Sequence, residues 1–442
     1  MVRKTHIRTM SLLLFSCLLF LCLPLTSSAQ ATPPVVTNVD AFCVINVEHK
    51  EVVVQSNMNK ILYPTSTVKL MTALVAAEYF ANNLEDRITI TKEMLASVIG
   101  RNLSLETGEE IRVTDLLHAM LVGGYNDAAI ILAHAVSGEL EAFCERMNQK
   151  AMELGACNTH YTNPTGLHDD AMYTTAYDTS LVGLAILENT TIFEMTKRKK
   201  YTIPATNKSE ERTIYNRNAL ITTSMTEKYY YSYAEGMNSG ATDEGGDCVV
   251  TAGKRDGLSW ICVVMGGRQS SADDDTNHAC FAAEDLLDHA LFGYEVKTLR
   301  SAKETISTIP VRFSATEESV DIKMARDLSA LLSLNVDLEK DISYDITLNT
   351  DLMEAPIKEG TVVGSVRAIY QGETIDSTEL ITARSIDSHG FLIFMYRFKQ
   401  VTQHPFVILF LFGTAGYGGY LLWKRTPSSD GKKDKRRRTR YF

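Results

Sequence analysis

The spacing of hydrophobic positions changes along the chain, and each spacing predicts a different element. Residues 41–46 and 51–55 are short, largely apolar runs on either side of His49-Lys50, which predicts a β-hairpin. Residues 68–80 are rich in Ala, Leu and Met and follow Pro64 and several hydroxyl residues, a pattern typical of a helix start. Further helices are predicted at residues 114–121, 127–136 and 175–188.

The pattern then returns to strands. Residues 247–252 and 258–266 predict two strands joined by a turn, and residues 280–291 predict a helix. Strands at both ends with helices between them indicate one mixed domain over residues 31–293. Residues 305–384 alternate β-branched and polar side chains, which predicts a small β-domain over residues 296–386.

Both ends of the chain carry long apolar runs. The run at residues 11–25 follows a basic start and precedes Ser27-Ser28-Ala29, which predicts a cleaved signal peptide, residues 1–29. The alternative is an uncleaved first transmembrane helix. Residues 405–423 hold no charged side chain, and their length matches a bilayer core, so a transmembrane helix is expected there after a linker at 387–403. The alternative is a buried helix of a soluble domain.

Charge is distributed unevenly along the 442 residues. The net charge is -10 in total, but residues 1–29 carry +3 and residues 424–442 carry +7, which leaves -20 on the body. By the positive-inside rule, residues 424–442 form a basic cytoplasmic tail and the acidic body lies outside a cell membrane that the chain crosses once. An acidic body also excludes nucleic acid as a partner, because that function needs a basic face.

Cysteine usage gives no sign of a metal centre. Six cysteines lie outside the predicted signal, at positions 43, 144, 157, 248, 262 and 280. Neither a Cys-x-x-Cys nor a His-x-x-x-His spacing occurs, so no metal site is expected. Six cysteines spread through so long a chain do not form a tight disulfide framework, and mostly buried thiols are expected.

The chemistry-bearing pattern is Ser66-Thr-Val-Lys69, at the predicted start of the helix at 68–80. Positions i and i+3 lie on one helix face, so the lysine amine can reach the serine hydroxyl. A buried lysine loses its proton more easily and can then act as a base toward the serine. The same spacing also occurs at residues 429–432 in the basic tail, and the alternative is a capping hydroxyl beside a solvated lysine.

Several segments in series resemble one enzyme family. Residues 63–74 (YPTSTVKLMTAL) look like the active-site segment of penicillin-binding enzymes, and of the low-molecular-weight D-alanyl-D-alanine carboxypeptidases in particular. Further matches occur in the same order and cover about residues 35–385. They are residues 116–129 (LLHAMLVGGYNDAA), 163–168 with 173–178, 236–257 and 355–382.

The resemblance implies a fold and a mechanism. The fold is a mixed α/β (α+β) transpeptidase-like domain with a central antiparallel sheet, followed by the small all-β domain. Ser66 would be the acylated nucleophile, Lys69 its base, and Asn126 would hold the substrate amide and Lys69. The third motif, Asn238-Ser239-Gly240-Ala241, would bind substrate, and the backbone N–H groups of Ser66 and Ala241 would form the oxyanion hole.

The implied reaction is cleavage of peptidoglycan stem peptides that end in D-Ala-D-Ala, without a cofactor and with β-lactams as covalent inhibitors. Two motifs depart from the family pattern. Gly124 replaces the second-motif serine, and Asn238-Ser239 replaces Lys-Thr in the third motif. The alternative is therefore a catalytically weak or inactive protein of the same fold that binds cell-wall peptides or a partner. β-Lactam hydrolysis ranks lower, because the sequence singles out no deacylating carboxylate.

Overall fold

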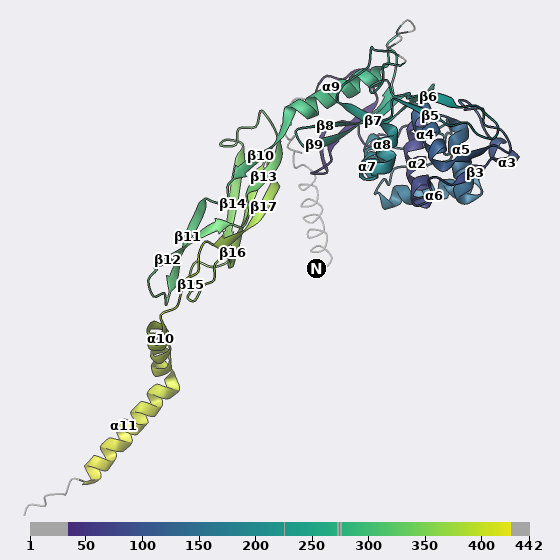
Figure 1. The fold of residues 1–442 in the computed structure, drawn as a ribbon. Coiled ribbons are helices and arrows are strands. Elements are labelled where there is room, and N and C mark those ends of the chain that lie inside the picture. Colours follow the sequence, from purple (N-terminus) through teal and green to yellow (C-terminus); the bar gives the residue numbers. More distant parts are fainter. Residues whose placement is uncertain (1–33, 225, 272–273, 275, 426–442) are drawn as a thin grey trace, which may run out of the picture. The chain divides into compact units, whose positions relative to one another are not determined.

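A computed structural model describes residues 34–224, 226–271, 274 and 276–425, in two units. The first unit is built on a five-stranded antiparallel sheet with the order β2-β1-β9-β8-β7 (Figure 1). Its strands are β1 (Ala41–Asn46), β2 (Glu51–Ser56), β7 (Ala234–Thr242), β8 (Gly246–Arg255) and β9 (Leu258–Gly267). The predicted hairpin and the predicted strand pair are confirmed, and the sheet joins the two ends of the unit.

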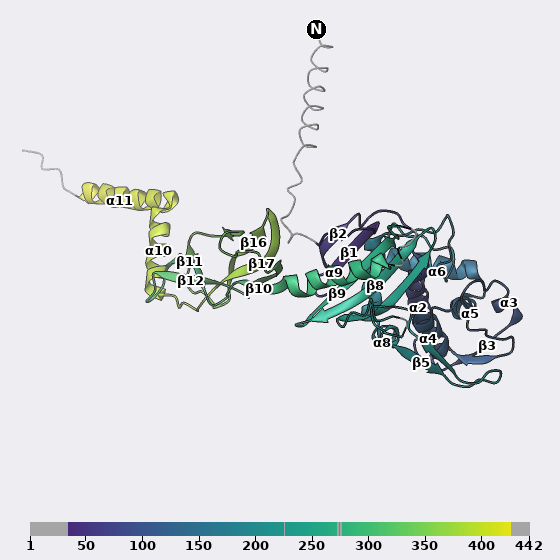
Figure 2. The same ribbon diagram turned by 90° about the horizontal axis from the view of Figure 1, so that it is seen from above.

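Helices cover both faces of this sheet because its strands are apolar on both sides. In β1, Cys43 and Ile45 lie in the core shared with most of the helices. Phe42 and Val44 lie in a second core with α9 (His278–Gly293), which packs on β8 and β9 from the other face (Figure 2). The first core is lined by α2 (Val68–Tyr79), α4 (Val113–Gly123), α5 (Asn126–Ser137), α6 (Leu140–Glu153), α7 (Ala176–Glu188) and α8 (Thr190–Thr196).

The predicted helices are confirmed, and each of their ends lies within two residues of the observed end. Local capping explains several of these boundaries. Thr175 accepts a hydrogen bond from the backbone of Asp178 and begins α7, and Asn277 begins α9 in the same way. Gly124 ends α4 in the left-handed conformation, with φ 71°. The unit also holds a short helix and two small strand pairs, which are α3 (Lys92–Leu95), β3 (Arg87–Thr89) with β4 (Glu110–Arg112), and β5 (Lys200–Ile203) with β6 (Arg212–Tyr215).

The second unit contains the predicted β-domain. Its six-stranded sheet has the order β14-β16-β17-β12-β11-β15, and alternate residues such as Val320, Ile322 and Met324 are buried. These strands are β11 (Thr305–Arg312), β12 (Ser319–Met324), β14 (Ile342–Leu348), β15 (Met353–Glu354), β16 (Val362–Tyr370) and β17 (Glu373–Thr382). A separate pair is formed by β10 (Tyr294–Arg300) and β13 (Leu328–Ser333).

The end of the described chain is helical. Helix α11 (Pro405–Arg425) is long and apolar enough to cross a membrane and contains the predicted span at 405–423. The segment expected to link the β-domain to the membrane span, 387–403, holds helix α10 (Gly390–Gln403). Its large apolar residues recur at helical spacing, at Phe391, Phe394 and Phe398, and no proline interrupts them. The expected signal peptide and nearly all of the basic tail lie outside the described residues.

The cysteines follow the expectation with one exception. All six cysteines of the described residues are free thiols, and only Cys157 is exposed. Burial raises the pKa of the Cys43 thiol to about 12 and that of Cys248 to about 11. These buried thiols therefore stay protonated and unreactive at neutral pH.

Candidate active site

Ser66 lies in a single 3-10 turn, η2 (Thr65–Thr67), which leads directly into α2. Pro64 precedes the turn, and Thr65 takes a left-handed conformation with φ 52° that costs a β-branched residue conformational strain. Strand β7 presses against this turn. A Cβ atom at Gly240 would lie 2.4 Å from the Cβ of Ser66, so only glycine fits there. The turn and β7 together hold the serine in one place.

Lys69 is the second residue of α2 and is 1% exposed. Its Nζ is 3.2 Å from Ser66 Oγ and donates to the carbonyl oxygen of Thr165 at 2.7 Å. Burial disfavours the charged ammonium and lowers the pKa of Lys69 to about 7. A large share of the amine is therefore neutral near pH 7, within hydrogen-bonding reach of a hydroxyl proton.

A turn at residues 163–168 holds the lysine from the other side. Asn163 Oδ1 accepts from the backbone N–H groups of Thr165 and Gly166, at 3.1 and 2.9 Å. Thr72 of α2 donates to the Pro164 carbonyl at 2.7 Å, which ties the turn to the helix that carries Lys69. Sequence reasoning assigned no role to Thr165, because a backbone carbonyl leaves no signature in the residue type.

The second motif forms the turn between α4 and α5. Asn126 is the first residue of α5 and is 5% exposed. Its Nδ2 donates to the Ile99 carbonyl at 2.8 Å, and within the described residues no hydrogen bond joins this side chain to Lys69. The expected role of Asn126 in holding substrate and Lys69 stays a prediction. Gly124 has a positive φ, so a serine at this position would be strained in this backbone.

The third motif lies on β7, the edge strand of the central sheet. Asn238 is 4% exposed, and its Oδ1 has no hydrogen-bond partner among the residues that the structure describes. Ser239 Oγ donates to the Arg217 carbonyl at 3.3 Å. Asn238 and Gly240 are two residues apart and so share the face of β7 that meets Ser66. Ala241 pairs with Asp247 across β7 and β8.

Arg217 is a cation that sequence reasoning missed. Its N–H donates to the Val122 carbonyl at 3.1 Å, and its Cγ lies 3.6 Å from where a Cβ of Gly124 would be. Arg217 therefore bridges the second and third motifs, since its own carbonyl accepts from Ser239. Another cation, Arg255, lies at the end of β8 over the ring of Phe292, and its hydrogen bonds and ion pairs within the described residues go to Leu291 and Asp256 and to no motif residue.

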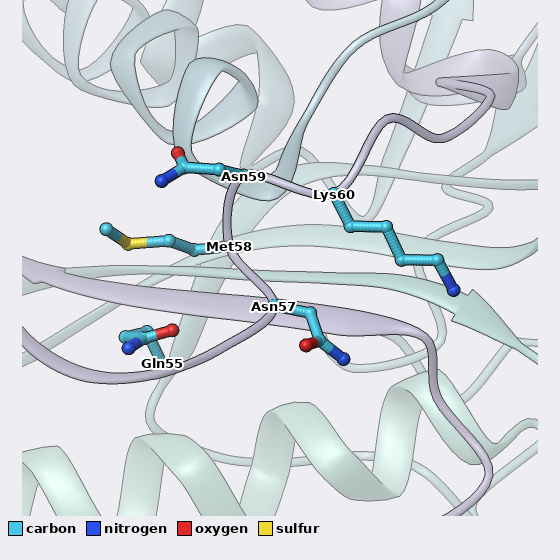
Figure 3. Close-up of a pocket in the computed structure, with 5 residues that line it drawn as sticks. All are labelled: Gln55, Asn57, Met58, Asn59 and Lys60. Carbon is cyan, nitrogen blue, oxygen red and sulfur yellow. The ribbon is translucent and has the colours of Figure 1, made fainter.

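The structure thus brings the predicted residues together in part. Ser66, Lys69 and Gly240 are in direct contact, and Ser239 reaches the second motif through Arg217. A pocket of about 560 Å³ lined by residues 55 and 57–60 involves none of them (Figure 3). In the described ranges no group of three His, Cys, Asp or Glu side chains is arranged to hold a metal ion.

Known proteins are similar to this chain over most of its length. The sequence profile of the D-alanyl-D-alanine carboxypeptidase family matches residues 27–269, and that of the penicillin-binding protein 5 C-terminal domain matches residues 294–388. The carboxypeptidase DacF of Bacillus subtilis is 26% identical over 350 residues, 78% of this chain and 85% of the relative. DacC of Escherichia coli is 26% identical over 401 residues, 88% of this chain and 94% of the relative.

Solved structures agree on the fold. The D-alanyl-D-alanine carboxypeptidase DacD of Francisella tularensis is 25% identical with a TM-score of 0.60, over 79% of this chain and 94% of that one. Penicillin-binding protein 5 of Haemophilus influenzae, at 23% identity, has the same fold with a TM-score of 0.59, over 81% of this chain and 99% of that one. The family profile covers more than half of the sequence, and both units have their counterparts. The chain belongs to the D-alanyl-D-alanine carboxypeptidase family.

Proposed function

We propose that this chain is a serine-type D-Ala-D-Ala carboxypeptidase that trims peptidoglycan stem peptides through an acyl-enzyme on Ser66. The observation that carries the proposal is the contact between Ser66 Oγ and the buried Lys69 Nζ at 3.2 Å, a distance suited to general-base catalysis. The family membership supplies the reaction class, and this pair supplies a nucleophile with its base.

The proposed chemistry needs only groups of this chain and water. Neutral Lys69 takes the proton of Ser66, whose oxygen attacks the carbonyl carbon of the penultimate D-Ala. The peptide bond breaks, the terminal D-Ala leaves with a proton returned by Lys69, and the remaining peptide stays on Ser66 as an ester. Water then hydrolyses the ester and regenerates the serine. A β-lactam is attacked in the same way and leaves its opened ring on Ser66.

The position of strand β7 supports the proposed function, because the substrate peptide can bind along this edge of the sheet. As the edge strand of the sheet, it can accept an extended peptide as an added strand. The close approach of Gly240 to Ser66 places this strand beside the nucleophile. The N–H groups of Ser66 and Ala241 are the proposed oxyanion donors, and Asn126 with Asn238 and Ser239 are the proposed substrate contacts.

Release of D-Ala tests this function directly. The full chain, purified in detergent, is incubated with a peptide that ends in D-Ala-D-Ala, and free D-Ala is measured. Wild type should release D-Ala, and Ser66→Ala should release none above background. If wild type binds the peptide but releases no D-Ala, the chain is the alternative binding protein, and the losses at positions 124 and 238 would explain it.

The membrane arrangement is also a proposal. We propose that α11 anchors the chain in the cell membrane as a single span and that the first unit faces outward, where peptidoglycan lies. The apolar helix and the basic residues that follow it support this orientation.

Protease accessibility tests the orientation. On intact cells without an outer barrier, added protease should digest the body of the chain, while an epitope placed after Lys424 should survive. Cells opened with detergent serve as the control, in which both parts are digested. Loss of the tail epitope with an intact body would reverse the orientation and remove the catalytic unit from its substrate.

A further inference from the structure

The turn that carries Asn126 is held by a loop from outside the three motifs. The backbone N–H of Asn126 donates to the Arg101 carbonyl at 2.7 Å, and its Nδ2 donates to the Ile99 carbonyl. The next residue, Asp127, accepts from the backbone N–H of Leu103 at 2.7 Å. Residues 99–103 therefore form a strap across the start of α5.

The side chain of Arg101 is hydrogen-bonded to the other end of the same turn, at Gly123. Its Nε donates to the Gly123 carbonyl at 2.7 Å. That carbonyl belongs to the last residue of α4, where a positive charge is favoured by the helix dipole. Arg101 thus contacts the turn at both ends: its side chain binds Gly123, and its backbone carbonyl binds Asn126.

Arg101 also fixes the residue between the two ends. Its Cζ lies 4.7 Å from the centroid of the Tyr125 ring, and Nη2 lies 3.5 Å from the Tyr125 hydroxyl. The ring lies against Gly123, where a Cβ would be 2.2 Å from Tyr125 Cε2. Gly123, Tyr125 and Arg101 therefore pack as one set, in which Gly123 leaves room for the ring and the guanidinium lies over it.

We infer that Arg101 is a positioning residue for acyl transfer: its side chain fixes the turn between α4 and α5 and, through that turn, the amide of Asn126. The inference rests on the proposed function, because Asn126 matters only if substrate is held at this site. Arg101 touches neither Ser66 nor Lys69 among its hydrogen-bond and ring contacts, so its effect passes through the turn. Orientation of a substrate-holding group has a large effect on rate, since small misplacements are costly.

The test is the rate of penicillin acylation, followed by intact-protein mass spectrometry on the full chain in detergent. Arg101→Ala should lower the second-order rate constant at least tenfold while the final amount of adduct stays that of wild type. Arg101→Lys, which keeps the positive charge, should recover to within about threefold of wild type. Arg146→Ala, which removes an exposed arginine from α6, is the matched control and should stay within twofold.

Measuring both the rate constant and the final amount of adduct distinguishes a loss of Asn126 positioning from a loss of folded protein. Partial unfolding lowers the amount of adduct that forms, whereas a misplaced Asn126 lowers the rate constant of the folded molecules. A rate constant for Arg101→Ala within twofold of wild type would overturn the inference. If Arg101→Ala does not fold, Arg101→Met keeps the aliphatic stem and is judged by the same criterion. An adduct that is absent from wild type, or present in Ser66→Ala, would overturn the proposed function itself.

Discussion

Replacing Lys69 by methionine should lower the rate constant of penicillin acylation by about 10³-fold, within the range that a general base contributes. The side chain keeps its length and its apolar stem, but the amine that lies 3.2 Å from Ser66 Oγ is lost. Intact-protein mass spectrometry of both proteins over time measures the two rates. Residual acylation would reflect binding and the oxyanion hole alone.

The pH dependence of the acylation rate of wild type is a second test of Lys69 as the general base. Burial lowers the pKa of Lys69 from 10.5 to about 7, and only the neutral amine acts as a base. The acylation rate should therefore rise through about pH 7 and level off above it. Lys69→Met should lose this rise along with the rate. A flat profile for wild type between pH 5.5 and 8.5 would contradict the assignment of Lys69 as the base.

Stability supplies the control for this variant. Between pH 7 and 10.5 the unfolded chain binds a proton at Lys69 that the folded chain does not, so this residue makes folding less favourable as the pH falls through that window. Below about pH 7 the cost has its full value. Lys69→Met removes the cost, and its melting temperature at pH 6 should equal or exceed that of wild type. A slow but well-folded variant then shows a loss of chemistry.

Restoring a cation in the third motif should raise the rate. We expect Asn238→Lys to increase the acylation rate constant, or kcat/KM for a D-Ala-D-Ala peptide, by about three- to a hundredfold. Two unit charges about 4 Å apart interact by about 1 kcal/mol in water and about 4 kcal/mol at an effective dielectric near 20. The new ammonium would attract the substrate carboxylate and would keep Lys69 neutral at a lower pH.

The competing expectation comes from Arg217. This arginine bridges the second and third motifs, and a second cation beside it would be repelled if it already serves the substrate carboxylate. Asn238→Met is the matched neutral control, because it has a similar chain length without charge. A rate equal to or below wild type for a well-folded Asn238→Lys would show that Asn238 is not a deficit.

Most of the fold follows from local pattern. Residues 68–80 and 127–136 are helical because apolar residues recur at helical spacing after suitable starts. The strands at 247–252 and 258–266 are short apolar runs on either side of a glycine turn. Helix α10 escaped prediction because its position next to a membrane segment favoured a linker, although its aromatic spacing was visible. The order of strands, which places β7 at the edge, depends on long-range pairing that no local pattern encodes.

The residues of the site also divide into those that local sequence predicted and those that depend on the tertiary fold. Ser66 and Lys69 were predictable because a spacing of three residues at a helix start makes them neighbours, and because residues 63–74 around them resemble the active-site segment of the family. Thr165 escaped prediction because it acts through a carbonyl, and Arg101 and Arg217 escaped because tertiary folding brings them to the second motif from 25 residues before and 91 residues after Asn126. The Asn126 Nδ2 donates to the Ile99 carbonyl, and the expected role of Asn126 in holding substrate and Lys69 stays a prediction.

The central claim is that Ser66 is the acylated nucleophile, and peptide mapping of the penicillin adduct tests it most directly. Full-length wild type and Ser66→Ala are incubated with penicillin, digested with protease and analysed by tandem mass spectrometry. The account predicts one covalent adduct in wild type, on the peptide that contains Ser66, and none in Ser66→Ala. An adduct that maps to another residue, or that persists in Ser66→Ala, would contradict it.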